Sequence, residues 1–370
     1  AGEKERNSPP ALASSLLSAG LRTTFAILDS HEDAEALAGV ASGITQCVKN
    51  VGADVLESAE VAGIAEKMFA IIDQSMQRSR KYLAVKQKSG ASANLPGDEE
   101  EDEEDWQEGE EEQLRRNCEE VLGAVMEVSA EHFQQCLPTC AEKMAAWLQT
   151  EQHRVLALYL ACDILLHLKE RAQSMWCVFM PQVFKSLSAG EKEDPDARTA
   201  AAYAVHMAAP FAAFDEAAPE AFRGLAKIVG GPKPKKRDHK GKRAMDNAVA
   251  ALCILAKEKR GLCPPDIQAW PLAIARMPLR DDEDEARKLH GKIVDLVLAQ
   301  DEALLGPGRA NLGPLLGVFA EIYQQESICD KPTEEKILKI FQMMPKDMLQ
   351  GLAGKFTEKQ MKKIEKMLCG

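Results

Sequence analysis

Residues 194–211 read DPDARTAAAYAVHMAAPF, a stretch dominated by small apolar side chains. Four of these side chains follow the spacing i, i+3, i+4 and i+7, which places them on one face of an α-helix. They are Ala201, Ala204, Val205 and Ala208. One such face occurs in many helical cores, so it predicts a packed helix but does not yet define the fold.

The same spacing returns along the chain at a nearly constant interval. Successive sets begin at Val40, Cys118, Leu158, Ala201, Ala248, Leu289 and Glu334. From Cys118 onward the steps between them are 40, 43, 47, 41 and 45 residues. Five prolines lie at or near the start of the preceding helix, where a missing N–H costs nothing: Pro138, Pro181, Pro219, Pro271 and Pro314. Two helices in a unit of this length have the period of HEAT or armadillo repeats.

The fold class follows from this repeat. No segment shows sustained two-residue alternation, so no strand is predicted. One helix pair cannot bury its own apolar face, whereas stacked pairs share a continuous core. We therefore predict an all-α fold, a right-handed α-α superhelix (HEAT-repeat solenoid) of roughly seven or eight helix pairs.

The negative charge of the chain is concentrated in one segment. The 370 residues carry a formal net charge of −12. Residues 97–112, GDEEEDEEDWQEGEEE, contain twelve acidic residues and no Lys or Arg, so the rest of the chain sums to about zero. A near-neutral body with one acidic segment indicates a local role for that charge.

Two charged segments interrupt the repeat and set the predicted domain boundaries. Eight adjacent carboxylates repel one another and cannot enter a core, so the acidic segment is predicted to be a disordered loop within one repeat. The second interruption is the Lys/Arg-rich PKPKKRDHKGKR. The predicted order is a disordered N-terminal lead (1–11), HEAT repeats (12–88), the acidic loop (89–109), HEAT repeats (110–231), a basic loop (232–243), and HEAT repeats with C-terminal capping helices (244–370).

Enzymatic and metal chemistry find little support in the sequence. The ten Cys form no CxxC pair and no expected disulfide framework, and they are predicted to be buried thiols in a reducing compartment. None of the seven His stands in HExxH spacing, and no nucleotide-binding or nucleophile-elbow motif occurs. We expect no enzyme, no cofactor and no bound metal. The sequence contains no apolar run of 18 residues, so no membrane span is predicted. It starts without Met or a signal peptide, which suggests a fragment.

Three segments resemble the C-terminal HEAT repeats of the importin-beta family of nuclear import receptors, of the karyopherin beta-3 type. They are LDSHEDAEALAGVASGITQCV (28–48), DPDARTAAAYAVHMAAPF (194–211) and LLGPGRANLGPLLGVFAEI (304–322). The resemblance runs from about Leu12 to the C-terminus, and that family carries an acidic insertion at the matching place. It implies binding of protein cargo, with Ran-GTP engaging mainly N-terminal repeats that are absent here. The basic segment 232–243 is larger than the family would suggest.

The acidic segment is the first candidate cargo-binding site. Its residues are Asp98, Glu99, Glu100, Glu101, Asp102, Glu103, Glu104 and Asp105, followed by Trp106. They are predicted to contact basic cargo segments, with Trp106 as an aromatic anchor. One alternative is that the loop mimics the ligand of a basic site and speeds release, and another is a solvated, solubilising loop. For the basic segment three interpretations stay open: a solvated loop, a contact to nucleic acid or an acidic partner, and a pseudo-cargo that folds onto the acidic loop. The basic segment has no interleaved aromatic residues, so its sequence does not favour specific nucleic-acid binding.

Further candidates lie on the second helix of each predicted pair, which is expected to line the concave face. They are His153, Arg154, Arg198, Tyr203, Asp246, Asn247, Arg287 and His290. The alternative for each is an ordinary surface or inter-repeat hydrogen-bonding role. Arg198 is predicted to join a ladder between repeats, and Asp196 to cap its helix. Six aromatic residues are predicted to pack in the core or between repeats: Trp147, Trp176, Phe211, Phe214, Phe222 and Trp270.

The resemblance implies a nuclear transport receptor fragment that binds protein cargo, with basic segments as its expected target. Nucleoporin FG repeats are a further candidate partner, and the expected location is cytoplasm and nucleus with shuttling through the nuclear pore. The rival function is a non-transport HEAT scaffold subunit of a protein complex. The repeat pattern alone does not separate the two.

Overall fold

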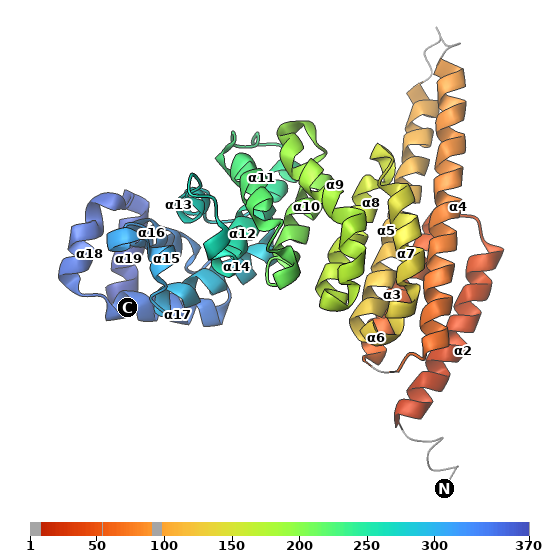
Figure 1. Ribbon diagram of the computed structural model, residues 1–370, viewed down its shortest axis with the longest axis horizontal. Coiled ribbons are helices and arrows are strands. Elements are labelled where there is room, and N and C mark those ends of the chain that lie inside the picture. The colour runs from red at the N-terminus through yellow and green to blue at the C-terminus, as the bar shows by residue number, and fades with distance from the viewer. Residues whose placement is uncertain (1–8, 54, 91–97, 370) are drawn as a thin grey trace. The chain divides into compact units, whose positions relative to one another are not determined.

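The computed structural model describes residues 9–53, 55–90 and 98–369, and every regular element among them is a helix (Figure 1). Contacts divide the chain into two compact units, Ala1–Met180 and Pro181–Gly370. We describe each unit by itself. Within the described residues, no helix combines the length and apolar character needed to cross a membrane.

Unit 1 holds three helix pairs. They are α2 (Pro9–Ser30) with α3 (Ala34–Val51), α4 (Ser58–Gly90) with α5 (Asp98–Val128), and α7 (Leu137–Trp147) with α8 (Glu151–Asp163). The connecting elements are α6 (Ala130–Phe133), the 3-10 turns Gln134–Cys136 and Lys169–Met175, and a π-helical turn, Ile164–Leu168. The second helices α3, α5 and α8 contact one another in order.

Unit 2 continues the pattern with five pairs, the first of which begins with the part of α9 (Trp176–Ala189) beyond Met180. The pairs are α9 with α10 (Pro195–Ala208), α11 (Ala218–Gly230) with α12 (His239–Glu258), α13 (Ala269–Ile274) with α14 (Glu283–Leu298), α16 (Leu312–Ile322) with α17 (Lys331–Met343), and α18 (Lys346–Leu352) with α19 (Glu358–Cys369). Helix α15 (Glu302–Leu305) and the 3-10 turns Gly190–Lys192, Ala212–Phe214, Arg260–Leu262, Pro307–Arg309 and Ala353–Lys355 connect them. Again the second helices α10, α12, α14, α17 and α19 contact one another in order.

Aspartate caps mark the start of most second helices. In five of them the capping carboxylate accepts a hydrogen bond from the backbone N–H three residues further on, which satisfies an otherwise orphaned donor. These caps are Asp33, Asp194, Asp238, Asp282 and Asp330. Asp194, Asp238 and Asp282 lie 44 residues apart. This periodic cap was present in the sequence and is a sharper repeat marker than the apolar sets.

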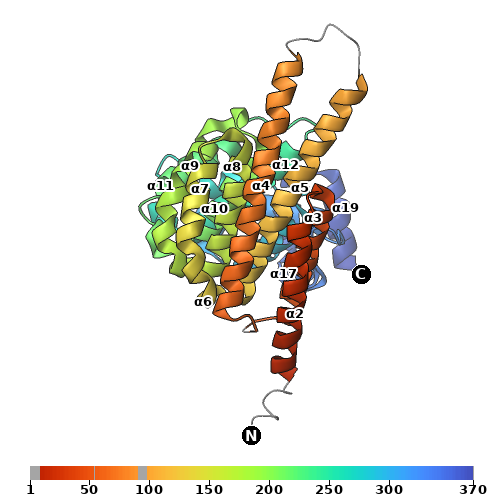
Figure 2. The same cartoon turned by 90° about the vertical axis from the view of Figure 1, so that its right-hand side faces the viewer.

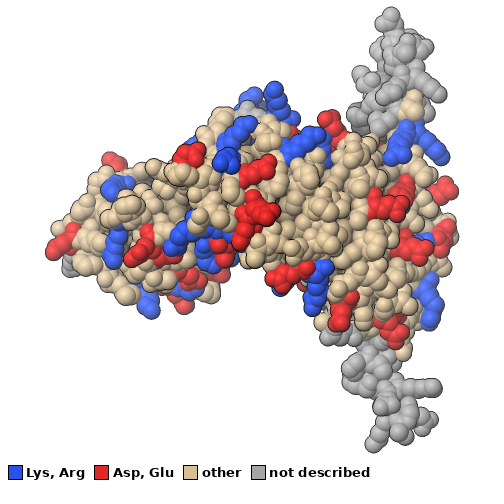
Figure 3. Space-filling model, viewed as in Figure 1, with Lys and Arg blue, Asp and Glu red and all other residues tan. Residues whose placement is uncertain are grey.

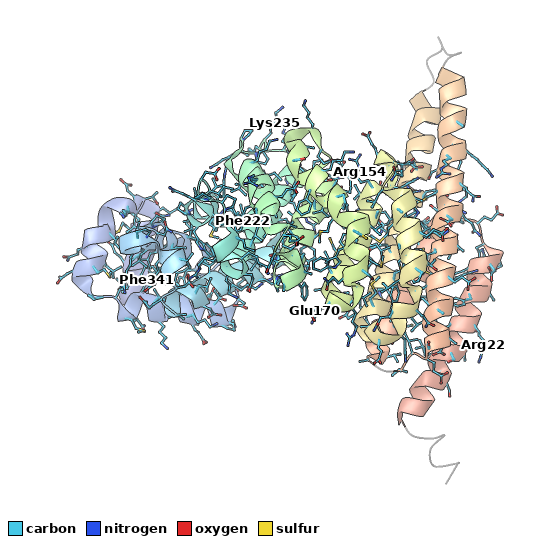
Figure 4. The ribbon with its side chains drawn as sticks, viewed as in Figure 1. Arg22, Arg154, Glu170, Phe222, Lys235 and Phe341 are labelled. Atoms are coloured by element: carbon cyan, nitrogen blue, oxygen red, sulfur yellow. The ribbon has the colours of Figure 1, made fainter. Side chains whose placement is uncertain are left out.

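The apolar sets that predicted the repeat lie in the core. The set that begins at Cys118 and the set that begins at Ala201 are fully buried. Burial raises the pKa of the Cys118 thiol to about 12, so this cysteine is a packed, inert thiol. Of the six aromatic residues predicted to pack, only Phe211 is half-buried rather than buried. Phe222 and Phe341 lie between the helices of unit 2 (Figure 4).

The prediction of a disordered acidic loop over residues 89–109 is wrong for most of its length. Helix α4 continues to Gly90, and α5 begins at Asp98, so 98–109 form its first turns. Residues 91–97 lie outside the described residues. Two effects outweigh the charge repulsion that argued for a loop. Glu is a good helix former and carboxylates near a helix N-terminus interact favourably with the helix dipole. Extending a helix that is already packed also avoids the cost of nucleation.

Two further boundaries are corrected. The basic segment 232–243 is a loop only to Asp238, because α12 begins at His239 with Asp238 as its cap. The segment does join the two helices of one pair, as predicted. At the other end of the chain, the predicted lead 1–11 overlaps α2, which begins at Pro9, and residues 1–8 lie outside the described residues.

Candidate functional site

The acidic residues of the first candidate site occupy the first turns of α5. Figure 2 shows α4 and α5 running side by side past the ends of α2 and α3. Asp98–Asp105 and Trp106 belong to this extension, and the positions of their side chains lie outside the description. Their backbone therefore places eight consecutive acidic residues on one helix rather than in an irregular loop.

A network of buried and half-buried polar side chains fixes α5 to α4 below the acidic turns. Arg78 of α4 donates two hydrogen bonds to the Glu111 carboxylate, at 2.5 and 3.0 Å. Arg115 of α5 donates to the hydroxyl groups of Ser75 (3.1 Å) and Ser79 (2.7 Å), and to Glu108 at 2.9 Å. Bidentate and charge-assisted bonds of this kind hold a defined geometry. The acidic turns thus extend from an anchored base.

The predicted residues of α8 lie beside the same network. His153 is 2 % exposed, and its pKa is lowered to about 4 by burial and, next, by the Arg115 and Arg80 guanidinium groups. It is therefore neutral at physiological pH. Arg154 lies at the start of α8 (Figure 4), with its guanidinium 3.6 Å from the Glu151 carboxylate.

In α10 the capping residue differs from the prediction. Asp194, rather than Asp196, accepts the hydrogen bonds at the helix start, because it occupies the N-cap position directly before Pro195. The Asp196 carboxylate instead accepts a hydrogen bond from Lys240 of α12 at 2.8 Å. It is therefore Asp196 that takes part in a contact between repeats. Arg198 is half-buried on the same helix.

Asp246 and Asn247 of α12 hold the loop that precedes α14. One oxygen of the Asp246 carboxylate accepts hydrogen bonds from three successive backbone N–H groups, those of residues 280, 281 and 282, at 2.9, 2.7 and 3.1 Å. The Asn247 amide donates to the Asp282 carboxylate at 2.8 Å. Both side chains are buried. Burial raises the pKa of Asp246 to about 6, although the three N–H groups act in the opposite direction.

The remaining candidates also make contacts within the protein; they are Tyr203, Arg287 and His290. The Tyr203 ring lies 5.8 Å from the His206 ring. Arg287 donates to the Ser327 carbonyl at 3.0 Å. His290 is 1 % exposed and bridges two segments, since its Nε2 accepts from Leu279 N–H at 3.2 Å and its Nδ1 lies 2.8 Å from the Ile328 carbonyl oxygen. The Tyr203 contact lies within α10, whereas the contacts of Arg287 and His290 correspond to the inter-repeat alternative that the sequence left open.

The basic segment divides into two parts with different surroundings. Where it is helical, it pairs with aspartates of neighbouring repeats: besides the Lys240 contact, Lys242 lies 3.6 Å from Asp281 and Arg243 lies 3.1 Å from Asp282. In the loop, Lys233, Lys235, Lys236 and Arg237 are exposed. Figure 3 shows basic side chains gathered where Figure 4 labels Lys235. The helical part therefore stabilises unit 2, and the loop part faces solvent.

Comparison with known proteins identifies the architecture. No family model matches the chain. The solved structure of Kap121p bound to RanGTP aligns with a TM-score of 0.72 at 15% identity, over 96% of this chain and 30% of that one. Kap121p bound to Pho4p gives 0.69 at 16% identity, over 96% and 31%. Kap121p bound to Nup53p gives 0.67 at 14% identity, over 97% and 32%.

The chain has the fold of a karyopherin HEAT-repeat solenoid. The predicted all-α HEAT architecture is thereby confirmed, and the eight described helix pairs fall within the predicted number. The chain spans about a third of the length of the Kap121p chains it matches.

Within this karyopherin fold, two polar clusters with buried members were missed by the sequence analysis. In unit 1, Glu119 of α5 and Asp163 of α8 share a side-chain hydrogen bond, and Asp163 sits against Gly123. In unit 2, the His206 ring lies with Nδ1 3.1 Å from Glu285 and Nε2 3.5 Å from Lys292. Each cluster joins residues from different repeats, so spacing along one helix carries no signal for it.

Proposed function

We propose that this chain is the cargo-binding, C-terminal part of a nuclear transport receptor of the importin-beta family, of the karyopherin beta-3 type. The observation that carries the proposal is the likeness over 96% of the chain to Kap121p, whose solved structures include complexes with RanGTP, with Pho4p and with Nup53p. The protein would move between cytoplasm and nucleus and bind its cargo reversibly. No catalytic step belongs to this role.

The acidic turns of α5 are the proposed cargo contact. Asp98–Asp105 place eight carboxylates on consecutive residues, and the chain outside residues 97–112 sums to about zero, so the electrostatic attraction for a basic segment is local. At physiological salt the Debye length is about 8 Å, which confines the attraction to partners that approach these turns. Trp106 would supply an apolar contact beside the charge. Basic cargo segments are therefore the proposed targets.

The other partners follow from the same likeness. Ran-GTP would engage mainly repeats outside this sequence, so the chain alone is expected to keep its cargo when Ran-GTP is added. Kap121p has been solved in complex with Nup53p. Nucleoporin FG repeats are thus proposed as partners of this chain or of a longer receptor that contains it.

Replacing the eight acidic residues 98–105 by Asn and Gln should weaken binding of a Lys/Arg-rich peptide at least tenfold in 0.15 M salt. The reason is that the substitution removes the local negative potential while the side chains keep nearly the same size. Fluorescence anisotropy with a labelled peptide measures the affinity. Raising the salt concentration should weaken peptide binding by the original chain and leave peptide binding by the variant nearly unchanged, because salt screens charge interactions.

A matched control separates local from total charge. The same number of exposed carboxylates is neutralised outside α5, including Glu142, Glu170 and Glu220. This control should retain peptide affinity within about twofold, a difference of roughly 0.4 kcal/mol. Equal weakening by both variants would mean that overall charge, rather than the acidic turns of α5, attracts the peptide.

A second experiment distinguishes a receptor from a scaffold. Proteins are captured from cytosol on a longer receptor that contains this chain, with and without Ran-GTP. Release of the captured proteins by Ran-GTP is the expected result. A constant stoichiometric partner that ignores Ran-GTP would favour the scaffold function instead.

A further inference from the structure

A hollow of about 160 Å³ lies in unit 2 where the loop before α14, the end of α16 and helix α19 meet. Its lining is polar and largely basic. The lining residues are Arg280, Glu321, Gln325, Lys359, Gln360 and Lys363. Three separate elements therefore bring cationic and amide side chains to one concave site that the cargo proposal does not use.

The one carboxylate in the hollow is already hydrogen-bonded through both oxygens. Arg280 donates to one Glu321 oxygen at 2.6 Å, and the Gln360 amide donates to the other at 2.9 Å. The Lys363 ammonium lies beside them but donates to backbone carbonyl oxygens, those of Glu321 at 3.0 Å and Tyr323 at 3.5 Å. Glu321 thus fixes Arg280 and Gln360 in place and does not pair with Lys363.

The hollow carries an excess of positive charge. Three cations, Arg280, Lys359 and Lys363, face a single carboxylate, which leaves two positive charges uncompensated. The pKa of Lys363 is lowered, first because the ammonium is partly desolvated and next because Lys359 repels it; Glu321 acts in the opposite direction, and Arg280 adds a smaller repulsion. An anion placed among these groups would relieve that repulsion.

Close packing of α16 against α19 shapes the site. A Cβ atom on Gly317 of α16 would lie 3.0 Å from the Gln360 amide nitrogen, so the glycine makes room for this side chain. Ile364 and Met367, on the next turns of α19, are buried. The basic residues of α19 are therefore presented by a helix that is seated in the core, rather than by a loop.

We propose that this hollow binds a phosphoryl group carried on a phosphorylated side chain of a partner protein. A phosphorylated Ser or Thr bears a charge of about −1.5 to −2 at neutral pH, which matches the two uncompensated cations. Its three terminal oxygens can accept hydrogen bonds from the Arg guanidinium and both ammonium groups at once. A side-chain carboxylate brings a single charge and would leave one cation unpaired. The site is independent of the acidic turns of α5.

Binding can be measured on the full 370-residue chain by phosphorus NMR. The probes are a short glycine peptide with one central phosphoserine and, separately, inorganic phosphate. Saturable broadening of the phosphopeptide signal is expected, and Lys363→Met should weaken this binding at least fivefold. Lys359→Met, at an exposed position, should act in the same direction. Lys362→Met, an exposed neighbour on α19, is the matched control and should bind like the original chain.

Each outcome decides the proposal. Loss of binding in the Lys363 and Lys359 variants, with an unchanged Lys362 variant and unchanged melting temperatures, supports it. If Lys363→Met lowers the melting temperature, Lys359→Met alone carries the test. Equal weakening by Lys362→Met, or unchanged binding in Lys363→Met and Lys359→Met, would overturn it. Binding of inorganic phosphate without binding of the phosphopeptide would overturn the assignment to a phosphorylated protein.

Discussion

Replacing Asp246 by alanine is expected to lower the free energy of unfolding by about 3 kcal/mol. The change removes the single carboxylate oxygen that accepts hydrogen bonds from three successive backbone N–H groups before α14. Each hydrogen bond to a charged acceptor contributes about 1.5 to 3 kcal/mol. Burial of the carboxylate carries an opposing cost, as its raised pKa of about 6 indicates, so the net effect lies below the sum of the three bonds.

Chemical unfolding measures this loss, and hydrogen exchange locates it. The amides of residues 280–282 should lose their protection in the Asp246 variant while those of α17 keep theirs. Asp246→Asn keeps one carbonyl acceptor and should lower the free energy of unfolding by clearly less than Asp246→Ala. The exposed Asp266→Ala in the same unit is the control and should change stability by less than about 0.5 kcal/mol. A loss of equal size at both aspartates would contradict the role assigned to the loop.

Replacing Glu119 by glutamine should stabilise unit 1 by about 1 to 2 kcal/mol at pH 7.5 and by little at pH 5. Glu119 and Asp163 are buried carboxyl groups that share a hydrogen bond, and this bond needs a proton. Burial, followed by the charge of Asp163, raises the pKa of Glu119 well above its usual value. Burial also raises the pKa of Asp163 to about 6. Glutamine reproduces the protonated form at every pH.

The direction of the pH dependence follows from these raised values. Between the unfolded and the folded pKa the native chain binds more protons than the unfolded chain, so its stability falls as the pH rises. The loss should therefore begin near pH 3.8 and extend through pH 6 for Asp163, and begin near pH 4.5 and extend well above it for Glu119, at about 1.4 kcal/mol per pH unit for each proton. Urea unfolding at several pH values should show this slope in the original chain and a smaller slope in Glu119→Gln. The exposed Glu142→Gln should leave the slope unchanged.

Much of the fold could be predicted because each helix carries its own apolar face. The sets that begin at Cys118 and at Ala201 are buried as their spacing required, and the prolines at 138 and 219 lie in the first turn of a helix. Such signals are local, so a single sequence contains them. The repeat period then follows from their recurrence.

Contacts between repeats could not be predicted in this way. Asp246 was a cargo candidate because it is polar and on a second helix, but its three backbone partners come from a loop 34 residues further on. Glu119 and Asp163 meet only because α5 and α8 are neighbours and Gly123 lets the carboxylate approach. The prediction for the acidic segment was wrong for a different reason. It considered the repulsion between carboxylates but not the packed part of α5 from which the acidic turns continue.

The aspartate caps have a consequence for how this chain can change in length. Because each capped second helix carries its own start signal, extra residues placed before the cap do not displace the helix that follows. The loop of exposed lysines ahead of Asp238 is an instance, since α12 still begins directly after that aspartate. The modules therefore tolerate insertions between paired helices without a shift in the register of later modules, and new surface elements can be added one connection at a time.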